Sequence, residues 1–132
     1  MATTTATITL SSADLTGDAL ALSSTATLTK SGGQTGLDQT TGIAVKKFTN
    51  SNAQTILSAS DYTNDRAHKV YLKNNSSVSS ENFKVVIGST DLGKIFAGDW
   101  AFIPWMGESD IKVTPSVPTE TVIEYAVFSD NT

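Results

Sequence analysis

Apolar side chains recur at alternate positions through the second half of the chain, from residue 69 to residue 128. Each apolar segment is short, and turn-forming residues such as Gly88, Gly98 and Pro115 separate neighbouring segments. The segments lie at residues 69–73, 83–87, 92–96, 100–105, 110–114 and 121–128. Strands of this length and spacing, with no helical period between them, predict an antiparallel β-sandwich or barrel.

The first half of the chain shows the same alternation in places. Further strands are expected at residues 2–10, 20–28, 43–48 and 53–57, the second with a break at Ser23-Ser24. Residues 31–42 predict a loop, and residues 59–66 a loop or a single helical turn. These segments predict an all-β antiparallel sandwich, with about eight or nine short strands expected to form it, for which a jelly roll is one arrangement.

Residues 100–105 (WAFIPW) form an expected strand with two apolar faces. Trp100 and Phe102 share one face, and Ala101 and Ile103 share the other. Such a strand lies between two layers of the protein, or between one layer and another molecule. Core packing and a subunit contact both stay open, with sugar stacking on an exposed tryptophan as a third alternative. The residues singled out for a contact are Phe96, Trp100, Phe102 and Trp105.

Composition narrows the functional classes. At 132 residues, the chain is expected to form one domain over residues 1–132. Cys is absent, which removes disulfides, thiolate nucleophiles and cysteine-ligated metals. A net charge of −4 disfavours binding to nucleic acid or anionic lipid, because both need clustered Lys and Arg. The first cation is Lys30 and the longest apolar run is short, so neither an export signal nor a membrane segment is expected.

His68 is the only histidine, and it lies just before the strand at residues 69–73. A Ser-His-Asp triad would need it as the base, but no G-x-S-x-G motif accompanies it. A surface or edge position is therefore expected for His68. One histidine without cysteine also cannot supply the usual ligands of a zinc site.

Oxygen-bearing side chains offer two further kinds of site. Asp61, Asn64 and Asp65 could bind calcium, but they lack EF-hand spacing, and capping of a turn is the simpler interpretation. A carboxylate pair for glycoside hydrolysis could be drawn from Asp91, Asp99, Glu108 and Asp110. All four acids are expected in solvated turns. No catalytic residue, metal site or cofactor is therefore assigned.

Residues 74–77 (NNSS) match the acceptor pattern for N-glycosylation. Because no export signal is expected, a hairpin turn after Lys73 is the preferred interpretation. Residues 78–82 would extend that loop.

Four segments of the second half form a recognisable set. They are residues 69–74 (KVYLKN), 92–105 (LGKIFAGDWAFIPW), 110–113 (DIKV) and 122–125 (VIEY). Together they resemble the small β-sandwich virion proteins of tailed bacteriophages. The pattern of that family is a YIKN strand, a G-(4–5)-G-E/D-x-A-F-x-P-W hairpin and a final VEY-x-x-F strand. The resemblance covers roughly residues 58–128 and leaves the N-terminal half unmatched.

The resemblance implies a structural role in the particle and no catalytic residues. Within the hairpin, Gly98 permits the positive φ of a tight turn, and Pro104 suits a strand end or edge. Trp105 can cap the end of the sandwich. Residues 1–12 are expected to be an edge strand of the sandwich or an arm that pairs with a neighbour.

The expected function is that of a non-enzymatic capsid decoration or cement protein, located in the virion after assembly in the host cytoplasm. Its expected partners are the major capsid protein or another virion protein, together with copies of itself, for which we expect a trimer. The alternatives are a tail or fibre adaptor, and a carbohydrate-binding module that uses Trp100 or Trp105 as a stacking platform.

Overall fold

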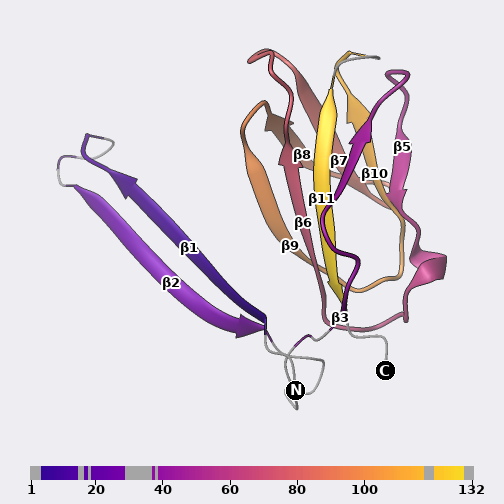
Figure 1. Ribbon diagram of the computed structural model, residues 1–132, viewed down its shortest axis with the longest axis horizontal. Helices are drawn as coiled ribbons and strands as arrows, with labels where there is room; N and C mark the ends of the chain where they lie inside the picture. The colour runs from indigo at the N-terminus through magenta and orange to yellow at the C-terminus, as the bar shows by residue number, and fades with distance from the viewer. Residues whose placement is uncertain are drawn as a thin grey trace. The chain divides into compact units, whose positions relative to one another are not determined.

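The chain divides into two compact units, residues 1–38 and residues 39–132 (Figure 1). The computed structural model describes residues 4–14, 17, 19–28, 37, 39–117 and 121–129. Within these described residues the regular elements are β-strands, apart from one turn of 3-10 helix, η1 (Ala59–Asp61). The all-β prediction is therefore confirmed. Most of the loop predicted at residues 31–42 lies outside the described residues.

The first unit contains an antiparallel hairpin of β1 (Thr4–Ser12) and β2 (Leu20–Leu28). The two strands pair along their whole length without a bulge. β2 is continuous through Ser23 and Ser24, because both serines keep their partners on β1, so the break predicted there is wrong. Among the described strands, β1 pairs with β2 alone and not with an edge of the sandwich.

The second unit is a sandwich of two antiparallel sheets. Its strands are β3 (Gln39–Thr40), β4 (Ala44–Lys47), β5 (Gln54–Leu57), β6 (His68–Asn74), β7 (Asn82–Ile87), β8 (Thr90–Phe96), β9 (Trp100–Trp105), β10 (Ile111–Pro115) and β11 (Val122–Ser129). One sheet has the order β5-β10-β7-β8, and the other has the order β3-β11-β6-β9, with β4 also paired to β11. Every strand predicted in the second half of the chain is present. The two-residue β3 was missed, because so short a strand shows no alternation.

Strand pairing in the sandwich is nested. β4 pairs with β11, β5 with β10, β6 with β9, and β7 with β8. The first of these eight strands thus meets the last, the second meets the seventh, and so on inward to the β7–β8 hairpin. This is the connectivity of a jelly roll, in which one long antiparallel ribbon is rolled into two sheets. The sandwich prediction is confirmed, and the jelly-roll arrangement with it.

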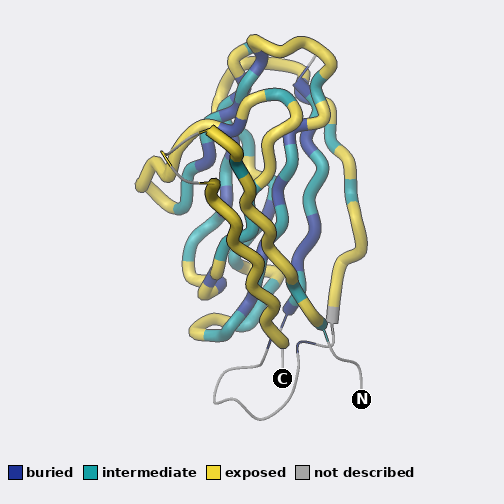
Figure 2. The backbone as a smooth tube through the Cα atoms, turned by 90° about the vertical axis from the view of Figure 1, so that its left-hand side faces the viewer, coloured by how far each residue is buried: buried dark blue, intermediate teal, exposed yellow. Residues whose placement is uncertain are grey.

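The core lies between the facing sides of the two sheets. β6 shows the reason most clearly, since its residues alternate strictly between buried and half-buried from His68 to Asn74. Figure 2 shows the buried positions on the strands of the sandwich, while the two hairpin strands are exposed along most of their length. The core comprises Phe48, Leu57, Val70, Leu72, Phe83, Val85, Ile95, Trp105, Ile111, Val113, Ile123 and Val127.

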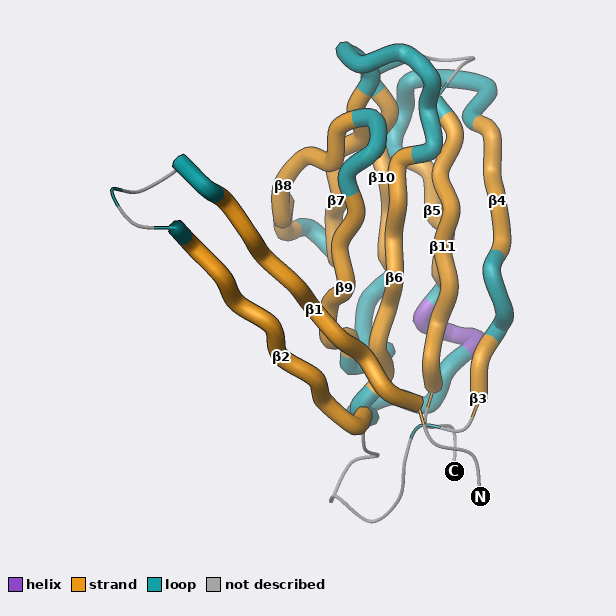
Figure 3. The backbone as a smooth tube through the Cα atoms, turned by 60° about the vertical axis from the view of Figure 1, so that its left-hand side comes forward, coloured by secondary structure: helices purple, strands orange, loops and turns teal. Residues whose placement is uncertain are grey.

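Two predicted hairpins are instead crossings between the sheets (Figure 3). β8 and β9 belong to different sheets, and so do β6 and β7. Gly98 does have the expected positive φ, at 87°, and the Asp99 N–H donates to the Phe96 carbonyl at 2.9 Å to close the turn. The hairpin predictions are wrong because alternation fixes the face that a residue occupies, and not the sheet to which its strand belongs.

Candidate binding surfaces

β9 divides its six side chains between the two faces of its sheet. Ala101, Ile103 and Trp105 face the core, and Trp100, Phe102 and Pro104 face outward. Pro104 lies on an edge strand as predicted, where its missing N–H leaves no broken ladder bond. The core interpretation therefore holds for the inward face of this strand, and the outward face stays a candidate contact.

Trp105 lies in the core with 4% of its surface exposed, so the contact predicted for it is wrong. Its indole N–H donates to the carbonyl of Ser109 at 2.9 Å, and its ring packs edge-on against Tyr62 with 5.0 Å between centroids. The His68 ring lies 5.6 Å from both of these rings. These three rings fill one end of the sandwich core.

His68 is fully buried, so the prediction of a surface or edge histidine is wrong. As the first residue of β6 it is in register with Trp105 of β9, and the two side chains therefore share the inward face. The His68 Nε2 lies 2.8 Å from the carbonyl oxygen of Thr63, which gives the buried ring a polar partner. His68 thus takes part in packing.

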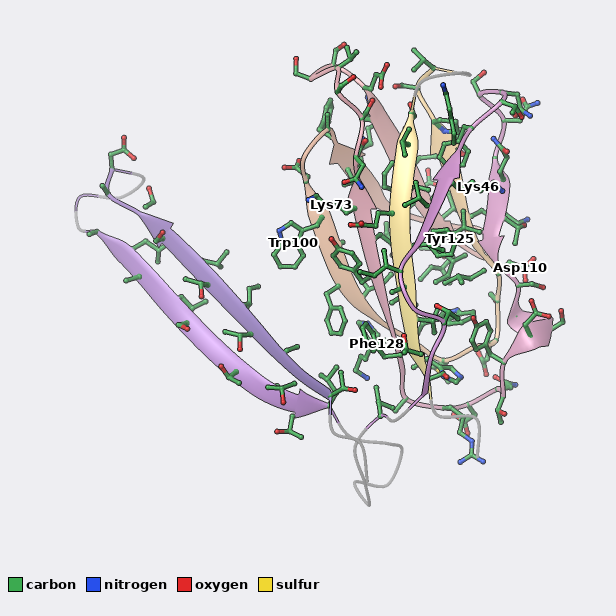
Figure 4. The ribbon with its side chains drawn as sticks, in the orientation of Figure 1. Lys46, Lys73, Trp100, Asp110, Tyr125 and Phe128 are labelled. Carbon is green, nitrogen blue, oxygen red and sulfur yellow. The ribbon has the colours of Figure 1, made fainter. Side chains whose placement is uncertain are left out.

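The outward face of the β3-β11-β6-β9 sheet carries a continuous group of apolar side chains. We call it the aromatic face, and it consists of Tyr71, Trp100, Phe102, Pro104 and Phe128. Tyr71 lies opposite Phe102, and the Phe102 and Phe128 rings are 6.2 Å apart across β6. Trp100 is 50% exposed and projects from β9 away from the sheet (Figure 4). The aromatic face therefore spans three strands.

Charged side chains border the aromatic face. Lys69 and Lys73 share the outward side of β6 with Tyr71, and Glu124 of β11 lies opposite Lys73. The Tyr71 hydroxyl donates to the Glu124 carboxylate at 3.2 Å. Burial raises the pKa of Tyr71, and the hydrogen bond to Glu124 and its negative charge raise it further. An aromatic centre with a polar rim is typical of a protein–protein contact.

The outward face of the β5-β10-β7-β8 sheet is more polar. Lys84 and Lys112 lie on it, and Lys84 forms an ion pair with Asp91 at 3.0 Å. Phe96 is 44% exposed at the end of β8 and faces the same way as Lys84. The four predicted contact residues therefore fall in three places, with Phe96 on this face, Trp100 and Phe102 on the aromatic face, and Trp105 in the core.

The β1–β2 hairpin also has two unlike faces. The apolar one, which we call the hairpin face, consists of Ala6, Ile8, Leu10, Leu20, Leu22 and Ala26. Its four large side chains are 40–48% exposed. On the opposite face, the hydroxyls of Thr7 and Thr25 lie 2.9 Å apart. Neither strand contains a charged residue.

The acids considered for catalysis have separate surroundings. Asp91 is paired with Lys84, and a carboxylate oxygen of Asp110 accepts the Ala59 N–H of η1 at 2.9 Å. Glu108 lines an open pocket of about 220 Å³ beside Trp105. Within the part of the chain that the structure describes, His, Asp and Glu side chains form no group of three or more that could hold a metal ion.

The turn containing Asn64 and Asp65 shows a local hydrogen bond. The side-chain oxygen of Asn64 accepts the Asp65 N–H at 2.7 Å, and Asp65 adopts a left-handed conformation with φ 58°. Asp and Asn tolerate that conformation better than most residues. This hydrogen bond is the kind of local contact that the turn-capping interpretation predicts.

Comparison of the sequence with protein-family models found no match, and comparison with curated proteins found no significant match. No helix among the described residues is long and apolar enough to cross a lipid bilayer. The aromatic face, the hairpin face and the four segments that resemble phage virion proteins are therefore the features from which a function can be inferred.

Sequence reasoning missed Tyr71 and Phe128 as members of the aromatic face. Tyr71 alternates with Lys69 and Lys73, a pattern that by itself indicates a solvated face. Its place beside Phe102 follows from the β6–β9 register, which joins segments some thirty residues apart. The one local signal was the apolar outward side of β9.

Proposed function

We propose that this protein is a non-enzymatic structural protein of a tailed-bacteriophage virion, specifically a capsid decoration protein that binds the outer shell and stabilises it. The resemblance described above supports this proposal, because its four segments correspond to β6, β8 with β9, β10 and β11 of the jelly roll. Jelly rolls are common among viral capsid domains, although a fold by itself does not assign a function. The proposed partners are the major capsid protein and further copies of this chain, as a trimer.

The observation that carries the proposal is the aromatic face. Contiguous exposed apolar surfaces mark contacts with other molecules, and Trp and Tyr are the side chains that most often dominate the energy of such contacts. Trp100 is half exposed, so covering it removes from water about half of the roughly 150–250 Å² that an aromatic side chain can bury. A subunit that assembles with other subunits would bury this surface in its contacts.

The two sheets allow two different contacts at once. Trp100 and Phe102 are the proposed subunit contacts, and Phe96 on the other sheet is the proposed shell contact, since it stays accessible when the aromatic face is covered. Each shell contact can be weak, because an oligomer held at several points gains from multivalency.

Addition of the purified protein to capsids that lack it tests the proposal. We expect saturable binding at micromolar concentration, and decorated shells that resist heat and low salt better than bare ones. Phe96→Ser should weaken binding, whereas Val78→Ser, which changes an exposed residue between β6 and β7, should not. A folded wild-type protein that fails to bind shells at micromolar concentration would contradict the proposal.

Imaging of whole particles separates a position on the shell from a position on the tail. Labelled antibody distributed over the shell is the expected result. Label confined to the tail would assign the protein to a tail or fibre adaptor instead.

A carbohydrate-binding module is the second candidate, and the exposed indole of Trp100 favours it, because an exposed aromatic ring can stack on a sugar. Trp105 cannot serve in this way, since it is buried. Soluble glucan and chitin oligosaccharides should be titrated while tryptophan fluorescence is recorded. A saturable change that Trp100→Ala abolishes would favour this candidate over the decoration protein.

A further inference from the structure

The β1–β2 hairpin lacks a partner for its apolar side within the described hairpin unit. A two-stranded hairpin is at best marginally stable in water, and it normally needs a third strand or a packed layer. Its large aliphatic side chains are 40–48% exposed, and they lie together on the hairpin face. The unit therefore has the structure of an arm that becomes fully stable when another surface covers this face.

The two faces of the arm indicate how it is covered. The Thr-bearing face is suited to water, and the hydroxyls of Thr7 and Thr25 form a hydrogen bond with one another there at 2.9 Å. The hairpin face contains no charged or aromatic side chain, and its pleated strands present a flat aliphatic surface. A second flat apolar surface, such as the outer side of a sheet, is the partner that this geometry suits.

The aromatic face is such a surface. It spans β9, β6 and β11, and it consists of rings where the hairpin face consists of aliphatic chains. Lys69 and Lys73 border it, and the uncharged arm would set no like charge against them. The stems of these lysines can extend along the arm while their ammonium groups stay in water.

We propose that the hairpin face of one copy packs on the aromatic face of a neighbouring copy, so that each copy in a closed oligomer gives one arm and receives another. Both surfaces belong to the same chain, and every copy therefore brings the occupant for its neighbour. The exchange covers the hairpin face and the aromatic face in one step. It rests on the subunit contact of the proposed function, and it does not require that the oligomer bind a capsid.

The area of the contact favours reciprocal exchange over a one-way contact. Two paired strands of nine residues span about 30 Å by 10 Å, so one arm on one sheet buries roughly 600 Å² in total. That value is within the range of crystal-packing contacts, whereas stable interfaces bury about 1,200 Å² or more. Reciprocal exchange between two copies makes two such contacts, which together bury about 1,200 Å² and reach that threshold.

Site-specific cross-linking tests the contact directly, because the natural chain has no cysteine. Ser24→Cys places a thiol on the hairpin face, Ser23→Cys places one on the opposite face, and Lys73→Cys places one beside the aromatic face. A short bismaleimide is suitable, since packed sheets lie about 10 Å apart, too far for a disulfide. A tagged Ser24→Cys copy mixed with an untagged Lys73→Cys copy should give a cross-linked heterodimer, and Ser23→Cys should give far less.

Two other results of cross-linking would overturn the proposal. Ser24→Cys copies that cross-link efficiently to one another would show arms packed on arms. A chain carrying both Ser24→Cys and Lys73→Cys that closes only on itself, at every dilution, would show the arm covering its own sandwich.

Sedimentation of full-length variants gives an independent test. Leu22→Asp should weaken association about tenfold or more, because it would bury a charge in the contact, and Trp100→Ser should also weaken it. The control is Ser23→Asp, which adds the same charge on the opposite face of the arm and should leave the oligomer intact. A mixture of Leu22→Asp and Trp100→Ser copies keeps one good arm and one good face, so it should associate more than either variant alone but less than the wild-type protein. A wild-type protein that stays monomeric at several hundred micromolar would overturn the proposal.

Discussion

The side-chain amide of Asn74 donates a hydrogen bond to the backbone carbonyl of Ile95 at 3.0 Å, and so joins β6 of one sheet to β8 of the other. The same nitrogen donates to the Glu81 carbonyl at 3.2 Å, and the Asn74 side-chain oxygen accepts the Ser76 N–H at 2.9 Å. Asn74 is fully buried. The first asparagine of the glycosylation pattern is thus a structural link at a corner of the roll.

Replacement of Asn74 should destabilise the sandwich. Asn74→Ala leaves two buried carbonyls without this donor and should lower the free energy of unfolding by about 1–3 kcal/mol. Asn74→Asp should cost more, because a carboxylate cannot donate these bonds and its charge would be buried. Urea unfolding of each variant measures the difference. Asn75→Ala, at an exposed position, is the control; equal losses at both positions would contradict this role for Asn74.

The two tryptophans should respond oppositely to truncation. Trp105→Ala removes a core side chain and should lower the free energy of unfolding by about 3–5 kcal/mol. Trp100→Ala should change the stability of the isolated monomer by about 0.5 kcal/mol or less, because its ring faces solvent. Thermal and urea melts at low protein concentration provide the comparison. Equal losses in the free energy of unfolding for the two variants would show that the Trp100 ring is packed as well.

Gly107 should tolerate substitution less well than Gly98. Both have positive φ, at 79° and 87°, so alanine at either position pays a backbone cost of about 1–2 kcal/mol. A Cβ at Gly107 would also lie 2.9 Å from the Thr63 carbonyl oxygen and 3.2 Å from the His68 ring, whereas at Gly98 nothing lies within 4 Å. Gly107→Ala should therefore be the less stable variant in denaturant unfolding. If Gly98→Ala were the less stable variant, the loop that contains Gly107 would be able to move and accommodate the added Cβ.

Stability should fall at alkaline pH, in part because of Tyr71. Burial and Glu124 raise its pKa above the ordinary value of 10.0, and burial and Asp61 act in the same direction on the pKa of Tyr62. The unfolded chain therefore loses these protons at a lower pH than the folded chain does. The stabilisation is complete below about pH 10 and is lost as the pH rises through the folded-state pKa.

Urea unfolding between about pH 9 and pH 11.5 measures this decline, and absorbance near 295 nm follows the tyrosines directly. Tyr71→Phe should remove part of the decline, and Glu124→Gln a smaller part. An unchanged pH profile in Tyr71→Phe would contradict the assignment.

The strands of the second half could be predicted because each strand has one side toward the core. Alternation along β6 and β10 reveals that side directly in the sequence. It does not reveal pairing partners, so the crossings at Asn74 and at Gly98 were taken for hairpins. The sequence places Asn74 in a surface turn, because the residues around it are turn formers. Its hydrogen bonds to carbonyls that are distant in sequence leave no local signal.

The candidate contact could be predicted only in part. The outward side of β9 is apolar along the sequence itself, which singled out Trp100 and Phe102, two residues that face outward from the sheet. The same pattern included Trp105, because two apolar faces give no sign of which one is buried. The rest of the aromatic face depends on long-range register, which no local pattern contains.

The place of β11 within its sheet has a consequence for biosynthesis. It is the last strand of the roll, yet it lies between β4 and β6 and pairs with both. A nascent chain can therefore not complete this sheet until residues 122–129 have left the ribosome. Closure of pairs so distant in sequence is slow, and a premature stop codon before residue 122 would remove a central strand of the sheet and not merely a frayed end.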